Sequence, residues 1–286
     1  MKIYKPKYQQ SEIFTFHRYY NKNIDEECVN LLTGYKEIVF GSVFNCPVDN
    51  LPKGIESIVF GQCFNQPVDN LSDEIISIVF CQHFNQSVDN LPEGLVNLEF
   101  GDFFNNSVNN LPISIKYLQF GLYFNQMVDN LPTNLECLVF GREFNQPIDN
   151  LPSNLKYLIL NQSFNQPINN LPESLQRISF SGNFNQVIRH FPQNLTHITF
   201  SDNFNQKIES LPNGLIYLEF GSKFNQDINN LPDSLQSLKL GINFNNNYKP
   251  LAKLPNSLKY LYLEKRSYQT CFNHTVIPDG LNKIYY

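Results

Sequence analysis

Apolar and polar positions follow one another along this chain in a pattern that returns every 20 residues. The unit from Leu51 to Asn70 reads LPKGIESIVFGQCFNQPVDN, and later units keep its apolar positions while most other positions vary. The dipeptide Phe-Asn marks the repeat eleven times without a shift, from residues 44–45 to residues 244–245. Repetition at this interval predicts a solenoid, in which each unit forms one coil that stacks on the next.

One short segment of each unit has the pattern of a half-buried β-strand. Ile58 and Phe60 are apolar at every second position, with Ser57 and Val59 beside them. Because side chains of a strand alternate between its two faces, one face is expected to enter the core and the other to stay open. Degenerate copies precede and follow the regular units, which gives fourteen expected strand positions. These strands are expected to pair in one parallel sheet.

The segments between the strands predict turns and extended chain. A Gly follows the strand in most units, and we expect it to permit a tight or left-handed turn out of the strand. Twenty residues leave no room for a long helix, and the Asn-Leu-Pro of the return segment favours a short 3₁₀ turn. Asn50 and its equivalents are expected to cap that turn by accepting a backbone N–H bond.

The whole frame of the unit is L-P-x-x-L-x-x-L-x-F-G-x-x-F-N-Q-x-V/I-x-N. Its middle, L-x-x-L-x-F, resembles the start of the leucine-rich-repeat pattern with Phe in place of the third Leu. The second Phe and the Asn five residues after the strand are typical of the FNIP (FGxxFN) class, which the chain resembles over nearly its whole length.

This resemblance implies a leucine-rich-repeat solenoid with one parallel β-sheet of short strands on the concave face. The convex side is expected to be irregular, extended or 3₁₀, with little α-helix. The two Phe residues of each unit are expected to stack as two columns inside the coil. The Asn that follows them is expected to form a buried amide ladder between coils.

A single solenoid is expected over residues 1–286. Residues 1–37 form an N-terminal cap with a degenerate repeat, residues 38–250 hold the regular repeats, and residues 251–286 hold irregular C-terminal repeats. The longest break in the register, residues 264–275, reads either as a loop that binds a partner or as a capping irregularity.

Composition and charge narrow the class of protein. Hydrophobic residues make up 42% of the chain, with 25 Phe and 15 Tyr, which is enough to build a core. A formal net charge of -5 argues against nucleic acid as a partner. No stretch approaches the ~20 apolar residues of a membrane span, and the six Cys lack the spacing of a disulfide or zinc framework. We therefore expect a soluble, intracellular, cytoplasmic protein with no nucleic-acid or membrane partner.

The outward positions of the expected strands are the candidate binding surface, because the concave side of a solenoid is broad and free to vary. Aromatic and aliphatic residues in the middle strands, followed by charged ones, are typical of interaction hot spots. The alternative is that neighbouring aromatic side chains stack along the sheet and stabilise it. We expect a protein partner to bind at Tyr117, Gln119, Val139, Tyr157, Ile159, Arg177, His197, Tyr217 and Glu219.

The residues that could support metal binding or catalysis each have a simpler explanation. One Asp per coil, at Asp49, Asp69, Asp89, Asp129 and Asp149, could hold a hard cation. Asx residues ahead of a Leu-Pro turn are more simply explained as local caps, and other units carry Asn, Arg or Glu there. The histidines fall at unrelated repeat positions, with no Ser, His and acid set. We therefore expect no enzyme, no metal and no cofactor.

The resemblance also implies a biological setting. FNIP repeats occur in social amoebae and in giant DNA viruses of protists, often behind an F-box that docks to a ubiquitin ligase. Residues 1–13, ahead of the first expected strand, are too few for an F-box, so we expect a free-standing interaction scaffold, in the host cytoplasm if the protein is viral. The alternatives are a substrate-recruiting subunit linked to ubiquitination, or a self-assembling component that forms a homodimer through open strand edges near residues 14–16 and 284–286.

Overall fold

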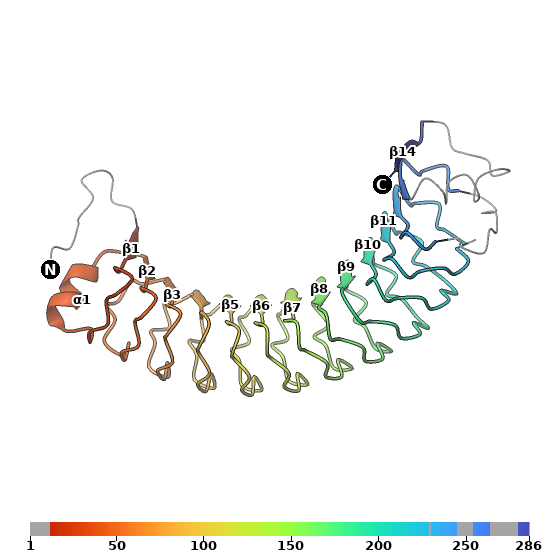
Figure 1. Cartoon of the computed structure of the whole chain (residues 1–286). Coiled ribbons are helices and arrows are strands. Elements are labelled where there is room, and N and C mark those ends of the chain that lie inside the picture. The colour runs from red at the N-terminus through yellow and green to blue at the C-terminus, as the bar shows by residue number, and fades with distance from the viewer. Residues whose placement is uncertain (1–11, 229, 245–253, 264–279, 286) are drawn as a thin grey trace.

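The computed structural model describes residues 12–228, 230–244, 254–263 and 280–285. These residues form one helix and fourteen short strands, and the coils follow one another along an arc (Figure 1). The strands line the inner, concave side of the arc, while turns and extended segments form its outer, convex side (Figure 1). The solenoid and its fourteen strand positions are confirmed.

All strand pairs are parallel, and each strand pairs with its neighbours in the sequence, in the order β1 to β14. In the regular part, the register advances by one repeat per strand, so that Ile58 lies opposite Ile78 and Leu138 opposite Leu158. The strands are β1 (Ile13–Thr15), β2 (Glu37–Val39), β3 (Ser57–Val59), β4 (Ser77–Val79), β5 (Asn97–Glu99), β6 (Tyr117–Gln119), β7 (Cys137–Val139), β8 (Tyr157–Leu160), β9 (Arg177–Phe180), β10 (His197–Thr199), β11 (Tyr217–Glu219), β12 (Ser237–Lys239), β13 (Tyr260–Leu263) and β14 (Asn282–Tyr285).

Two columns of phenylalanine rings form the centre of the core. In the first column the ring centroids of Phe60 and Phe80 are 5.2 Å apart at an interplanar angle of 4°. In the second column Phe64 and Phe84 are 6.1 Å apart at 7°. Within one coil the two rings also stack, with 3.9 Å between the centroids of Phe60 and Phe64. The predicted columns are confirmed.

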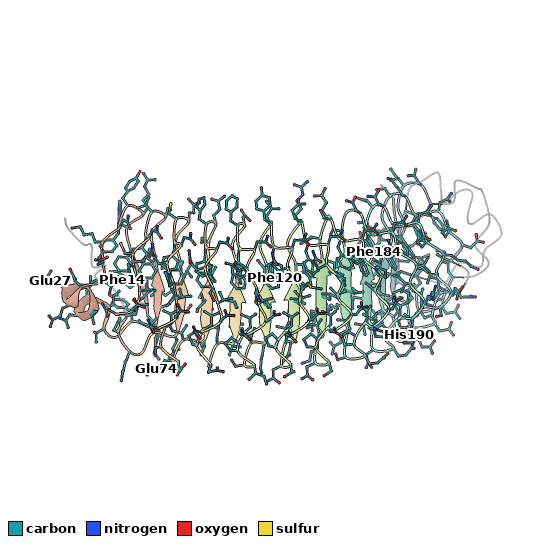
Figure 2. All side chains as sticks on the ribbon, turned by 90° about the horizontal axis from the view of Figure 1, so that it is seen from below. Phe14, Glu27, Glu74, Phe120, Phe184 and His190 are labelled. Atoms are coloured by element: carbon teal, nitrogen blue, oxygen red, sulfur yellow. The ribbon has the colours of Figure 1, made fainter. Side chains whose placement is uncertain are left out.

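Figure 2, which looks at the convex side, shows Phe120 of the first column and Phe184 of the second in the middle of the band of coils. Glu74 and His190 lie along one margin of that band (Figure 2). The apolar interior is therefore continuous from coil to coil, and each coil is stabilised by burial against its neighbours.

A ladder of asparagine side chains joins the coils beside the second Phe column. The Oδ1 atom of Asn45 accepts a bond of 2.8 Å from the backbone N–H of Asn65, and the same bond recurs in each coil from Asn21 to Asn225. The predicted ladder is confirmed, but its predicted burial is wrong, since Asn45 and Asn105 are exposed and most others half-buried. Each Asn side chain extends toward the backbone of the next coil and not toward the core, and the ladder therefore lies near the surface.

The glycine after the strand begins the tight turn that the sequence predicts, since the N–H of Phe64 donates to the carbonyl of Gly61 at 3.2 Å. The left-handed alternative is wrong, because positive φ angles among the described glycines occur only at Gly34, Gly54, Gly182 and Gly280. A Cβ atom on Gly61 would lie 1.9 Å from the carbonyl oxygen of the preceding coil's glycine. Glycine is required there because adjacent coils approach too closely for a side chain.

The convex side is held by bonds between coils and by single turns. The Nδ2 atom of Asn70 donates to Oδ1 of Asp49 at 3.1 Å, and Asn90 donates to Asp69 in the same way. The expectation that these Asn residues cap their own turn is therefore wrong at these positions. The N–H of Leu95 donates to the carbonyl of the Pro three residues earlier, at 3.0 Å. The described residues contain such isolated turns and no 3₁₀ helix.

One short helix, α1 (Glu26–Leu32), lies against the first coils at the N-terminal end of the arc (Figure 1). The Asp25 carboxylate accepts the backbone N–H of Cys28 at 2.9 Å, which satisfies a free donor of the first turn. Leu32 is fully buried and joins the core. The sequence analysis did not predict this helix, although an Asp followed by two Glu is a helix-start pattern.

The part of the chain that the structure describes stops at residue 263 and resumes at residue 280. The expected loop at residues 264–275 lies outside it, so the prediction for that loop stands as made. Of the described segments, none forms a helix with the length and apolar character that crossing a membrane requires.

Candidate functional site

The concave face is built from the first and third residues of each three-residue strand. The middle residue points into the core, as in β6 and β7, where Leu118 and Leu138 have no exposed surface. Parallel register then aligns the outward residues in two rows across the sheet, with Tyr117 opposite Cys137 and Cys137 opposite Tyr157. All nine residues predicted to bind a partner occupy these outward positions.

An apolar patch lies in the middle of this face, on β6, β7 and β8. Its two most exposed members are large: Tyr157 and Ile159 keep 37% and 38% of their surface open. An outward strand position normally carries a polar side chain, so an exposed Tyr and Ile on one strand are the less common arrangement. We define the apolar patch as Tyr117, Cys137, Val139, Tyr157 and Ile159.

Stacking along the sheet accounts for only part of the aromatic content of this face. The rings of His197 and Tyr217 do stack, with centroids 5.8 Å apart at 20°. Tyr117 and Tyr157 are separated by the strand that carries Cys137, and neither makes a ring–ring contact with another described aromatic residue. The alternative explanation, ring stacking along the sheet, is thus confirmed for His197 and Tyr217 and does not explain the apolar patch.

The polar residues beyond the patch are ordered by bonds within the face. The Tyr117 hydroxyl donates to Oε1 of Gln119 at 2.7 Å. The Tyr217 hydroxyl donates to Oε2 of Glu219 at 2.6 Å, and Nζ of Lys239 donates to Oε1 of the same carboxylate at 2.6 Å. Burial and then the bond to Glu219 raise the pKa of Tyr217 far above its ordinary range. This end of the face therefore has fixed side chains and balanced charge.

Arg177 lies between the apolar patch and this polar end. Its guanidinium carbon is 5.9 Å from the ring centroid of Tyr157, within cation–π range. On its other side His197 lies opposite it on β10. Partial burial and then the nearby Arg177 charge lower the pKa of His197, which favours the neutral imidazole.

A row of alternating charges at the start of the same strands was missed by the sequence analysis. Glu136 accepts a bond of 2.6 Å from Lys156, and its other oxygen lies 3.7 Å from Nζ of Lys116. The bond from Lys156, then its charge, lowers the pKa of Glu136. Opposite charges at the same repeat position in consecutive units are visible in the sequence and could have indicated this row.

A second missed feature is an aromatic stack at the turn that follows the strands. The ring centroids of His83 and Phe103 are 5.3 Å apart, and those of Phe103 and Tyr123 are 5.2 Å apart, at angles of 10° and 19°. Aromatic residues at one repeat position in three consecutive units are its sequence signal. Because the rings cover one another's faces, the stack is accounted for by packing between coils.

Residues considered for metal or thiol chemistry have other contacts. Asp49, Asp69, Asp89 and Asp129 each accept a bond from an Asn of the next coil. No group of three or more His, Cys, Asp or Glu within the described ranges is arranged to hold a metal ion. A cavity of about 410 Å³ lies away from the concave face, in the return segments, and is lined by residues 207–211, 227–228 and 230–231 together with Phe220.

Comparison with known proteins gives one family and one fold. The chain matches the family described as FNIP Repeat over residues 84–123, 124–163, 144–183, 164–202, 184–223, 204–243 and 244–285. None of the curated proteins matches it.

Two solved structures share the architecture. CroV588, described as a novel circular LRR protein structure, superposes with a TM-score of 0.69 and 33% sequence identity over 95% of this chain. The chain spans about half of that protein, 49% of its length. An internalin (inlF) from Listeria monocytogenes has a TM-score of 0.59 and 15% identity, covering 91% of this chain and 82% of its own, which shows the shared fold alone.

Proposed function

Because this chain belongs to the FNIP repeat family of leucine-rich-repeat solenoids, we propose that it is a non-catalytic scaffold that binds a protein partner on its concave face. Folds of this kind commonly mediate protein–protein interaction, since stacked repeats create an extended concave surface. The nine outward residues predicted from the sequence are the proposed contact residues.

The observation that carries the proposal is the apolar patch on β6 to β8. Tyr157 and Ile159 are more than one-third exposed on strands that are otherwise amphipathic. Exposed apolar surface rimmed by polar residues marks interaction sites, and Tyr and Arg are enriched among residues that dominate binding energy. Tyr157 supplies exposed apolar surface and Arg177 lies beside it, so the patch has both the polar rim and the two residue types.

The direct test is affinity capture with wild-type protein and a Tyr157→Asp/Ile159→Asp double variant as bait. A partner that docks on the patch should be retained by the wild type and lost by the variant, with affinity reduced about 30-fold or more if the pair contributes ~2 kcal/mol. The matched control is Met127→Asp, which alters a side chain that is 61% exposed and lies outside the sheet.

Melting temperature must be recorded for the same three proteins. The proposal requires the double variant to melt close to the wild type, because both substituted side chains point away from the core. Capture of the same partner by a double variant that melts like the wild type would show that the apolar patch is not the binding surface. An equal loss of capture in the Met127 control would show that the effect is not specific to the patch.

A second candidate function is self-assembly, supported by the two ends of the sheet. Among the described strands, β1 pairs with β2 alone and β14 with β13 alone, so each has an edge that no described strand pairs with. The chain spans 49% of a protein described as circular. Two copies could therefore complete a ring if the last strand of each paired in parallel with the first strand of the other.

Light scattering coupled to gel filtration tests this candidate. Self-assembly predicts a mass near twice that of the 33.2 kDa chain, and a shift toward monomer when Thr15→Pro removes a backbone donor from the edge strand. A monomer mass across the whole accessible concentration range would exclude a stable two-copy ring.

A further inference from the structure

The apolar patch is bracketed by two opposite charges. Glu99 is the last residue of β5, one strand before the patch, and Arg177 is the first residue of β9, one strand after it. Both are outward positions, flanking a buried Leu98 and a buried Ile178 respectively. The face therefore runs from a carboxylate, across apolar side chains, to a guanidinium.

These two charges are not neutralised within the part of the chain that the structure describes. The other opposite charges on the face pair with each other, since Lys239 binds Glu219 at 2.6 Å. Neither Glu99 nor Arg177 forms an ion pair with a described residue. Exposed or half-buried charges at the ends of an apolar patch are free to pair with a partner.

The charges of Glu99 and Arg177 also shift the pKa values of neighbouring side chains on the concave face. Partial burial, then the charge of Glu99, raises the pKa of Tyr117 in the adjacent strand. At the other end, Arg177 is the second cause, after burial, of the lowered pKa of His197. Lys116 and Lys156, which flank Glu136, add net positive charge at the edge of the sheet where the strands begin. Arg177, the first residue of β9, lies at this same edge.

The separation of the two charges fixes the size of a complementary partner. Four strand steps of ~4.8 Å, together with the offset from the end of β5 to the start of β9, place the charges about 20 Å apart. An extended polypeptide covers that distance in about six residues at ~3.3 Å each. A small ligand could not contact both charges and the patch at once.

On the premise that the concave face binds a protein, we propose that its partner is a polypeptide segment with an apolar centre flanked by one basic and one acidic side chain about six residues apart. The basic side chain pairs with Glu99, the apolar centre covers Tyr157 and Ile159, and the acidic side chain pairs with Arg177. The charges determine how the segment lies across the sheet.

Other classes of partner fit this arrangement less well. A nucleic-acid strand would place phosphates against Glu99, where like charges repel. A segment without charged side chains would leave Glu99 and Arg177 desolvated and unpaired, which weakens binding and so selects against it. The zwitterionic segment is the partner that satisfies both ends of the patch.

The experiment uses phage-displayed peptides with two fixed residues six positions apart and five randomised apolar residues between them. Four pools carry one basic and one acidic residue in either order, two basic residues, two acidic residues, or Gln and Asn. Each pool is selected on wild-type protein, Glu99→Arg, Arg177→Glu and the Glu99→Arg/Arg177→Glu double variant, and enrichment is measured by sequencing.

Wild type and the double variant should both prefer the mixed-charge pool by about threefold to tenfold, because the double variant restores complementarity with the segment reversed. Glu99→Arg should prefer the acidic pool and Arg177→Glu the basic pool, and these preferences should weaken as salt is raised. The control substitutions Glu93→Arg and Arg189→Glu alter exposed charges outside the sheet and should leave the wild-type preference unchanged.

The same selection separates this inference from the proposed function. Selected peptides that lose binding with Tyr157→Ala, but show no dependence on the two charges, would overturn the inference and leave concave-face binding in place. Peptides that bind regardless of both kinds of substitution would overturn concave-face binding as well. Failure of every pool to enrich on wild-type protein would also overturn the inference.

Discussion

The Oδ1 atom of Asn145 accepts a hydrogen bond of 2.9 Å from the backbone N–H of Asn165 in the next coil. The same Oδ1 and the backbone oxygen of Asn145 also accept from Nε2 of Gln166, at 3.3 and 3.0 Å. One amide side chain thus satisfies a backbone donor at the junction between two coils, and its repetition holds the coils in register.

Replacement of Asn145 by Leu should reduce the free energy of unfolding by about 1–3 kcal/mol, because it leaves a partly buried N–H without an acceptor. Asn145→Asp keeps an acceptor and should have a smaller effect. Chemical denaturation measures both. Asn213→Ala, at an exposed turn position, is the control and should change stability by less than about 0.5 kcal/mol. Equal effects at the two sites would contradict the role given to the ladder.

The two Phe columns should differ in their tolerance of leucine. The first column already contains Leu160 and Leu240, whereas all eleven regular units carry Phe in the second. Phe144→Leu removes a ring that stacks 3.7 Å from Phe140 and 6.1 Å from its neighbours on both sides. We expect it to destabilise the protein by about 2–3 kcal/mol and Phe140→Leu by about 1 kcal/mol. Thermal unfolding of both variants measures this difference, and equal losses or the reverse order would contradict it.

Glycine-to-alanine substitutions should show that glycine is required where two coils approach closely and is dispensable elsewhere. A Cβ atom on Gly141 would lie 1.7 Å from the carbonyl oxygen of Gly121, so Gly141→Ala requires the backbone of two coils to shift. We expect a loss of about 2–4 kcal/mol. Gly214 has neither a positive φ nor an atom near its Cβ position, so Gly214→Ala should be neutral or stabilise by about 0.4–1 kcal/mol. Hydrogen exchange around both sites would locate the effect, and a harmless Gly141→Ala would rule out the close packing described.

Protonation of His197 should be coupled to Arg177. Its folded-state pKa lies below the ordinary value of 6.5, because of burial and the Arg177 charge. The unfolded chain then binds the proton more readily, so this contribution to stability is present above about pH 6.5 and is lost as pH falls from there through the lower folded-state pKa. NMR titration of the imidazole should give a pKa below 6.5 that rises in Arg177→Gln. An unchanged pKa in that variant would mean that burial alone causes the shift.

Much of the fold could be predicted from the sequence because identical residues recur at identical positions. The strand at Ser57–Val59, the stack of Phe60 on Phe80 and the bond from Asn65 to Asn45 each join one coil to the next, so one period describes them all. The helix at Glu26–Leu32 was missed because it occurs once, in an insertion without periodicity. The sequence predicted the turn at Gly61 but not the reason that glycine is required there, because a pattern of residue types does not specify how closely two backbones approach.

In the candidate site, the residues that face outward follow from the alternation of positions in the strand, which has only two outcomes. How those residues contact one another follows from the folded arrangement of the coils. It pairs Lys239 with Glu219, leaves Glu99 and Arg177 at opposite ends of the apolar patch, and stacks His197 on Tyr217. These relationships depend on side-chain direction and on distances across several coils, which a one-dimensional repeat does not contain.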